Sequence, residues 1–130
     1  MENSEKGQFN EQIRERTIVM AVNIHELFVT TKVSPVTRPI VNQIIRSSAS
    51  VASNYRAATR SRSDAEFYSK ICIVVEEIDE TQFWFDYLKR IKLLEETRVS
   101  NLFGEVNELV RLFTSIKGKM KEKLRLADKP

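Results

Sequence analysis

One stretch of the chain carries arginines and no acidic residue. Between residues 38 and 62 there are five arginines and neither Asp nor Glu. They are Arg38, Arg46, Arg56, Arg60 and Arg62. Arg56 and Arg60 are spaced i,i+4, so a helix places both side chains on one face. Because arginines that neutralise phosphates give salt-dependent, largely sequence-independent binding, Arg56, Arg60 and Arg62 are the candidate nucleic-acid-binding residues.

Two further features bear on this basic segment. Tyr55 lies next to Arg56 and could stack on an exposed base, but its position fits the apolar stripe of a helix equally well. The C-terminal stretch is also basic, with Lys117, Lys119, Lys121, Lys123, Arg125 and Lys129. Cations at a helix C-terminus interact favourably with the helix dipole, so this second cluster does not by itself indicate a ligand.

The segment that follows the arginines is acidic. Residues 64–96 contain nine acids against four bases. Glu76 and Glu80 are spaced i,i+4, and Glu77 and Glu80 are spaced i,i+3, so these carboxylates crowd one side of a helix. Like charges placed in this way repel one another, and the cluster therefore needs cations to neutralise it.

Metal ions and arginines are the two kinds of cation to consider. Di-metal carboxylate bundles use Glu-x-x-His motifs on facing helices. The chain has one histidine and no such motif, so we predict no metal site. Arg46, Arg56 or Arg60, from the same or a neighbouring subunit, can pair with the carboxylates and orient the helices. The predicted structural salt-bridge residues are Arg46, Glu76, Glu77 and Glu80.

Residues suited to catalysis are scarce. His25 is the one histidine, and Cys72, the one cysteine, lies in an apolar run typical of a buried thiol. The three glycines are isolated and cannot form a phosphate-binding loop. No serine lies in the strand–turn–helix elbow of a nucleophile. We therefore expect no enzyme, no catalytic residue and no cofactor.

The spacing of apolar residues predicts four helices, over residues 11–31, 38–58, 63–91 and 95–125. Pro39 fits the first turn of the second helix, and Ser63 with Glu66 forms a capping-box pattern before the third. Small side chains at 47–53 allow a neighbouring helix to approach closely. Short links predict an all-α antiparallel up-down-up-down four-helix bundle over 11–125, between a disordered leader (1–10) and a disordered tail (126–130).

Composition is that of a globular protein with one domain. The chain has 130 residues, 42% of them apolar, and a formal net charge of +3. It contains no apolar run long enough to span a bilayer and no secretory signal, so we expect a cytoplasmic protein with no membrane partner. The first, third and fourth helices carry more apolar residues than one bundle core needs, which predicts a homo-oligomer.

Two runs of the sequence resemble a known bacterial family. SVASNYRAATRSRSDAEF (50–67) and EEIDETQFWFDYL (76–88) are similar to stretches of the four-helix-bundle proteins encoded within intervening sequences of 23S ribosomal RNA genes. The most specific parts are residues 54–57 and 79–81, with Trp84 following. The resemblance covers about residues 18–117 and implies an antiparallel four-helix bundle that assembles as a pentameric ring.

A related branch of that family comprises the accessory variability proteins of diversity-generating retroelements. These are basic proteins that associate with a reverse transcriptase and with nucleic acid. The resemblance therefore implies that Arg56, Arg60 and Arg62 contact RNA or DNA. This chain departs from that branch in its acidic third helix and modest net charge, and the resemblance supplies no catalytic residue.

Two hypotheses follow. The first is an oligomeric, non-enzymatic accessory protein that associates with nucleic acid through the basic end of its second helix. The second is a homo-oligomeric protein-interaction scaffold whose arginines form salt bridges between subunits. In the second case the arginines pair with Glu76, Glu77 and Glu80 and are not available to a partner.

Overall fold

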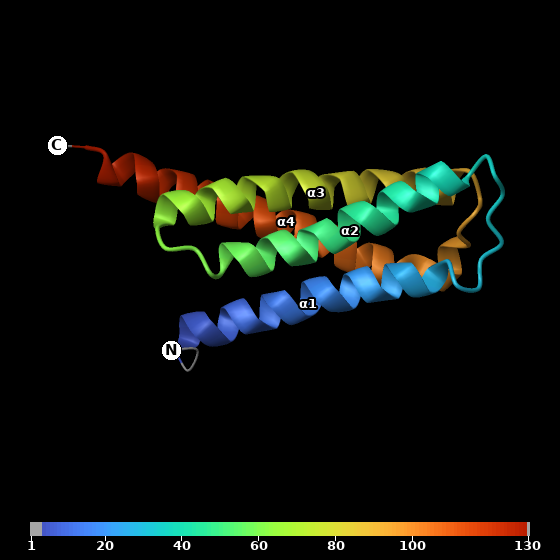
Figure 1. Cartoon of the computed structure of the whole chain (residues 1–130), viewed down its shortest axis with the longest axis horizontal. Helices are drawn as coiled ribbons and strands as arrows, with labels where there is room; N and C mark the ends of the chain where they lie inside the picture. Colours follow the sequence, from blue (N-terminus) through green and yellow to red (C-terminus); the bar gives the residue numbers. More distant parts are fainter. Residues whose placement is uncertain (1–3, 130) are drawn as a thin grey trace.

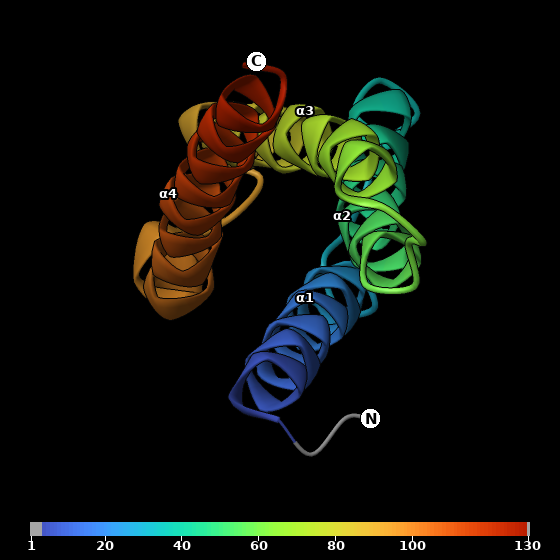
Figure 2. The ribbon, with the colours of Figure 1, turned by 90° about the vertical axis from the view of Figure 1, so that its left-hand side faces the viewer.

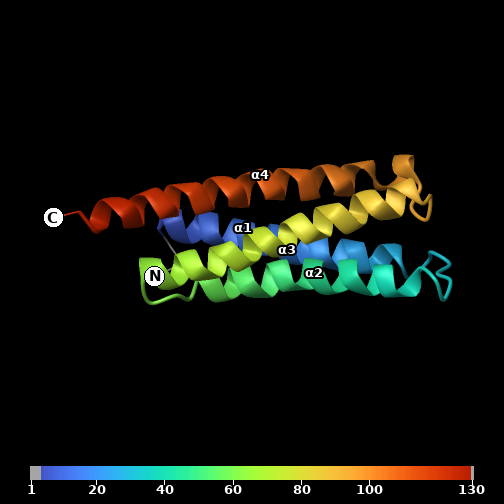
Figure 3. The same ribbon diagram turned by 90° about the horizontal axis from the view of Figure 1, so that it is seen from above.

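A computed structural model describes residues 4–129, which form four α-helices and no strand. They are α1 (Glu5–Leu27), α2 (Arg38–Ala58), α3 (Asp64–Arg90) and α4 (Glu96–Ala127). The chain runs along the length of the molecule and back twice (Figure 1), and the view from above shows the same course (Figure 3). Consecutive helices are therefore antiparallel, and the predicted all-α four-helix bundle is confirmed.

The outer helices are placed differently from the prediction. α1 begins at Glu5, so residues 5–10, assigned to the leader, are helical. Ser4 caps this helix, because its side-chain oxygen accepts a hydrogen bond from the Gly7 N–H at 3.0 Å. α1 ends at Leu27, and α4 continues to Ala127, into the segment assigned to the tail. Residues 1–3 of the predicted leader and Pro130 of the tail lie outside the described residues.

The two inner helices begin where the capping signals place them. The Ser63 hydroxyl accepts a hydrogen bond from the Glu66 N–H at 3.1 Å, as in a capping box. The Glu66 carboxylate accepts a hydrogen bond from the backbone N–H of Arg62, the residue before the N-cap, at 3.5 Å. Pro39 occupies the first turn of α2, where its missing N–H removes no helical hydrogen bond.

The core is concentrated along α2 and α3, which pack against each other most extensively. Fully buried side chains from all four helices meet there: Ile24, Ile44, Val51, Ile71, Ile78, Phe85, Leu109 and Phe113. Ser47 of α2 and Thr81 of α3 are also buried, and their hydroxyl oxygens lie 2.8 Å apart. The small side chains of α2 therefore permit the close approach that the sequence indicates.

The contact between the first and last helices is the least extensive of the four helix–helix contacts in the bundle. Viewed end on, the ribbons of the four helices follow a horseshoe, with α1 and α4 at its two ends (Figure 2). A bidentate pair joins them, with the Arg16 guanidinium 2.7 and 3.1 Å from the Glu105 carboxylate oxygens.

Large apolar side chains remain exposed on two of the helices expected to carry an excess. On α1 they are Phe9, Ile18, Val19 and Val22, and on α3 they are Ile73, Phe83 and Tyr87. On α4 most apolar residues pack against the core, and Leu126 near the helix end is exposed. The unpaired apolar surface is therefore carried by α1 and α3.

Candidate nucleic-acid interface

The predicted binding residues lie together at one end of the bundle. Arg56 belongs to the last turn of α2, and Arg60 and Arg62 follow in the connection to α3. All three side chains are exposed. With Lys70 of α3 they line an open depression on the surface. The depression lined by these four cations is called the basic groove below.

The basic groove contains one carboxylate, that of Glu66. Across residues 4–129, the side chains of Arg56, Arg60 and Arg62 form no ion pair. The acids at residues 76–80 do not reach them, because Glu77 lies 11 residues beyond Glu66 on α3, about 16 Å along the helix axis. The proposed neutralisation of that cluster by Arg56 or Arg60 does not occur within the chain.

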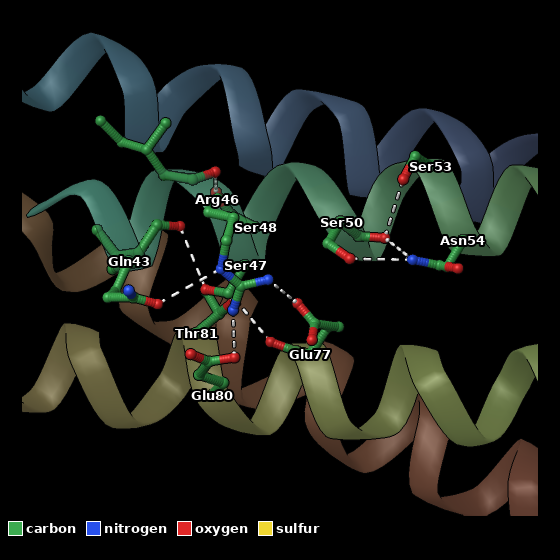
Figure 4. A network of polar contacts seen from close by, with 12 residues as sticks. Gln43, Arg46, Ser47, Ser48, Ser50, Ser53, Asn54, Glu77, Glu80 and Thr81 are labelled. Atoms are coloured by element: carbon green, nitrogen blue, oxygen red, sulfur yellow. Dashed lines mark hydrogen bonds and ion pairs between the residues drawn. The ribbon is translucent and has the colours of Figure 1, made fainter.

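Arg46 does pair with the acidic cluster. Its two terminal nitrogens lie 3.0 Å from a Glu77 carboxylate oxygen and 2.6 Å from a Glu80 carboxylate oxygen. Figure 4 shows the guanidinium reaching from α2 to both acids on α3, directly beside the buried hydroxyls of Ser47 and Thr81. The pair therefore fixes the same helix contact that the small side chains make possible.

The ion pairs of Arg46 with Glu77 and Glu80 are partly exposed to solvent. The hydrogen bond to Glu80 is the main cause that raises the pKa of Arg46 above its ordinary value. The second Glu80 oxygen accepts a hydrogen bond from the Trp84 indole N–H at 3.3 Å. Glu76, the fourth predicted salt-bridge residue, is exposed and forms no ion pair among the described residues. Arg46, Glu77 and Glu80 thus form one structural cluster without Glu76.

Tyr55 belongs to the core and not to the surface. Its side chain is 1% exposed, and its ring packs against Phe113 with centroids 5.3 Å apart. Burial raises the pKa of Tyr55 to about 12, partly opposed by the charge of Arg14. Of the two interpretations left open by the sequence, the apolar stripe is the one realised.

The basic C-terminal segment lies at the same end of the bundle as the basic groove. α4 projects beyond the other helices there (Figures 1 and 3). Lys123 pairs with Asp64 at 3.1 Å and Arg125 pairs with Glu122 at 2.6 Å. Lys119 and Lys121 are exposed and form no ion pair within the described part of the chain.

Sequence reasoning missed one member of the basic groove. Lys70 follows Glu66 by four residues on α3, so both lie on one helix face beside Arg62. The spacing of Arg62, Glu66 and Lys70 was a usable signal. This spacing was overlooked because acidic residues outnumber basic ones in the rest of the helix.

Other kinds of site find little support in the geometry. In the part of the chain that the structure describes, no three His, Cys, Asp or Glu side chains are grouped to hold a metal ion. His25 is exposed, with Glu26 as its neighbour at 3.7 Å. Within residues 4–129, no helix combines the length and apolar content needed to cross a membrane.

A comparison with known protein families identifies the family to which this bundle belongs. The model of the family described as 23S rRNA-intervening sequence protein matches residues 10–115. The chain belongs to this family. The match includes α2, α3 and the whole basic groove, and it ends before the projecting part of α4. No curated protein matches the chain.

A solved structure shares the fold of this 23S rRNA-intervening sequence protein. It is a protein with unknown function from the S23 ribosomal protein family of Bacteroides thetaiotaomicron. The two chains are 24% identical and superpose with a TM-score of 0.71, over 84% of this chain and 97% of the other. The likeness shows the bundle fold.

Tyr55 makes unfolding depend on pH in the alkaline range. An unfolded chain ionises a tyrosine near the ordinary pKa of 10.0, whereas the folded chain keeps Tyr55 protonated until about 12. The stability that this residue contributes is complete below pH 10 and falls as pH rises toward 12. Urea unfolding should therefore show a smaller loss of stability over this range in Tyr55→Phe than in the wild type. Equal losses in both proteins would contradict the burial of this phenol.

Proposed function

We propose that this protein binds the phosphate backbone of RNA or DNA through the basic groove. The observation that carries the proposal is that Arg56, Arg60 and Arg62 are exposed and unpaired within the described residues, although the next helix is rich in acids. A guanidinium without an internal partner keeps all its N–H donors for a ligand, and phosphate oxygens match its planar fork. The proposed role is binding and not catalysis.

The proposed binding reads charge and shape, and it does not read bases. Sequence-specific recognition of single strands relies on aromatic side chains that stack on splayed bases. Tyr55, the aromatic residue nearest the arginines in sequence, is buried in the core. The groove instead offers four cations, which neutralise phosphates in any sequence.

The proposal predicts salt-sensitive binding that depends on Arg56 and Arg60. Labelled single- and double-stranded RNA and DNA of equal length are titrated by fluorescence anisotropy at several salt concentrations. For duplex ligands, Arg56→Gln with Arg60→Gln should weaken binding and reduce the slope of log K against log salt by about 2, since each phosphate contact contributes roughly 0.9.

A matched double variant separates this groove from general charge. Arg38→Gln with Arg111→Gln removes the same charge from two exposed arginines away from the groove. This control should retain the wild-type slope. Equal loss in both double variants, or no salt-sensitive binding by the wild type, would refute the proposal.

A second candidate function is a homo-oligomeric scaffold, favoured by the exposed apolar side chains of α1 and α3. Phe83 and Tyr87 flank Trp84 on α3, with ring centroids 4.9 and 5.6 Å from the indole, and Phe83 is 57% exposed. A groove between α1 and α2 is lined by Ile18 and Val22. Exposed apolar patches of this kind mark interaction surfaces. A second copy of the chain carries both the aromatic patch of α3 and the groove between α1 and α2, so it can provide the complementary surface. In this version, subunits join through apolar contacts, since the Arg46 pair is satisfied within one chain.

Sedimentation velocity distinguishes apolar from ionic assembly. Phe83→Ser with Tyr87→Ser should shift the protein to smaller species, because it removes apolar area that the scaffold buries. Arg46→Gln should leave the sedimentation coefficient unchanged. Dissociation caused by Arg56→Gln with Arg60→Gln, but not by the aromatic variant, would show that the arginines join subunits and would contradict the apolar interface.

A further inference from the structure

A small pocket lies at the end of the bundle where three helix ends meet. Its lining comes from the start of α1, the connection between α2 and α3, and α4. The pocket encloses about 220 Å³. Its polar lining includes Lys6, Asn10, Ser61 and Arg62, while Phe67 and Met120 supply apolar walls. A cavity of this size lined by two cations and several hydroxyl groups suits a small anion better than an apolar ligand.

Ser61 carries an unsatisfied group at this pocket. Its hydroxyl is buried and has no hydrogen-bond partner among residues 4–129, and it is the one such side-chain atom there. Leaving a buried polar group without a partner is unfavourable, because the group has lost its hydrogen bonds to water. Folded proteins rarely keep such a group unpaired, and a bound ion can supply the missing partner.

Two lining cations occupy positions that are unfavourable for the helices themselves. Lys6 lies in the first turn of α1, and Arg62 immediately precedes Ser63, the N-cap of α3. The N-terminus of a helix carries a partial positive charge, so cations there lower helix stability. Neither side chain forms an ion pair within the described residues. An anion between them would offset both penalties.

The start of α3 adds backbone donors to the same wall. The Glu66 N–H is taken by the Ser63 hydroxyl, but the N–H groups of Asp64 and Ala65 have no acceptor within their own helix. Free N–H groups at a helix N-terminus bind phosphate well. The Asp64 carboxylate also lies here, and Lys123 at 3.1 Å neutralises it. With Glu66, the surroundings hold three cations against two carboxylates.

We infer that this pocket binds a phosphate group. Ser61, Lys6, Asn10 and Arg62 donate to its oxygens, and the first turn of α3 supports them with its dipole. Arg62 also lines the basic groove, so the two sites are continuous. The extension from free phosphate to the terminal phosphate of a strand rests on the proposed function. In that case a strand lies along the groove and its phosphorylated end enters the pocket.

The pocket is tested first with inorganic phosphate. Amide spectra of the full chain are recorded by NMR as phosphate replaces chloride at constant ionic strength. Saturable shifts are expected at Ser61, Arg62, Asp64 and Ala65. Shifts that do not saturate, or that spread over Lys119 and Lys121 equally, would overturn the inference.

Variants separate a ligand role from a structural one. Ser61→Ala and Lys6→Gln should each weaken phosphate binding about tenfold, as expected for losing a hydrogen bond to a charged group. Neither should lower the stability of the phosphate-free protein, because Ser61 is unsatisfied and Lys6 opposes the helix dipole. Ser115→Ala and Lys121→Gln, both exposed positions on α4, serve as controls without effect. Unchanged phosphate affinity in Ser61→Ala and Lys6→Gln would reject the site.

Oligonucleotides with and without a 5′ phosphate test the connection to the groove. Strands with the phosphate should bind about tenfold more tightly, and Ser61→Ala should abolish this preference while leaving the salt dependence intact. Saturable phosphate binding without any oligonucleotide binding would refute the proposed function and keep the pocket. Oligonucleotide binding that ignores the terminal phosphate, with no free-phosphate binding, would refute the pocket alone.

Discussion

The close packing of α2 against α3 is the contact on which the rest of the molecule depends. Ser47 and Thr81 meet there in the buried interior, and a larger residue at either position would separate the helices. Because the helices lie so close, Arg46 reaches both Glu77 and Glu80 across the seam. One register between two helices therefore fixes the core and determines which arginine is paired internally.

The same register leaves the remaining charge on the surface. Arg46 pairs with the carboxylates at the middle of α3. The arginines at and after the end of α2 lie beside the first turns of α3, where Glu66 is the one acid that lines the basic groove. The basic end of the molecule is then completed by Lys70 and the projecting part of α4. The exposed apolar side chains lie on α1 and α3, and Arg56 also borders the groove lined by Ile18 and Val22 of α1.

Local signals in the sequence were sufficient to predict where the two inner helices, α2 and α3, begin. Pro39 and the Ser63 cap mark the starts of α2 and α3, so their positions and the bundle class follow from the chain. The start of α1 could not be predicted, because residues 5–10 carry little apolar periodicity and depend on Ser4. Apolar spacing also does not specify the register between helices. It could not decide whether Arg46 or Arg56 meets the acids, nor bring Lys6 beside Ser61.

The central claim is that the arginines differ in their availability to a phosphate backbone. NMR of the arginine Nε–Hε groups during titration with an oligonucleotide measures this directly. The signals of Arg56, Arg60 and Arg62 should shift and saturate together, while that of Arg46 remains in place because its guanidinium is held by Glu77 and Glu80. A shift of Arg46 with the other three unchanged would contradict the account.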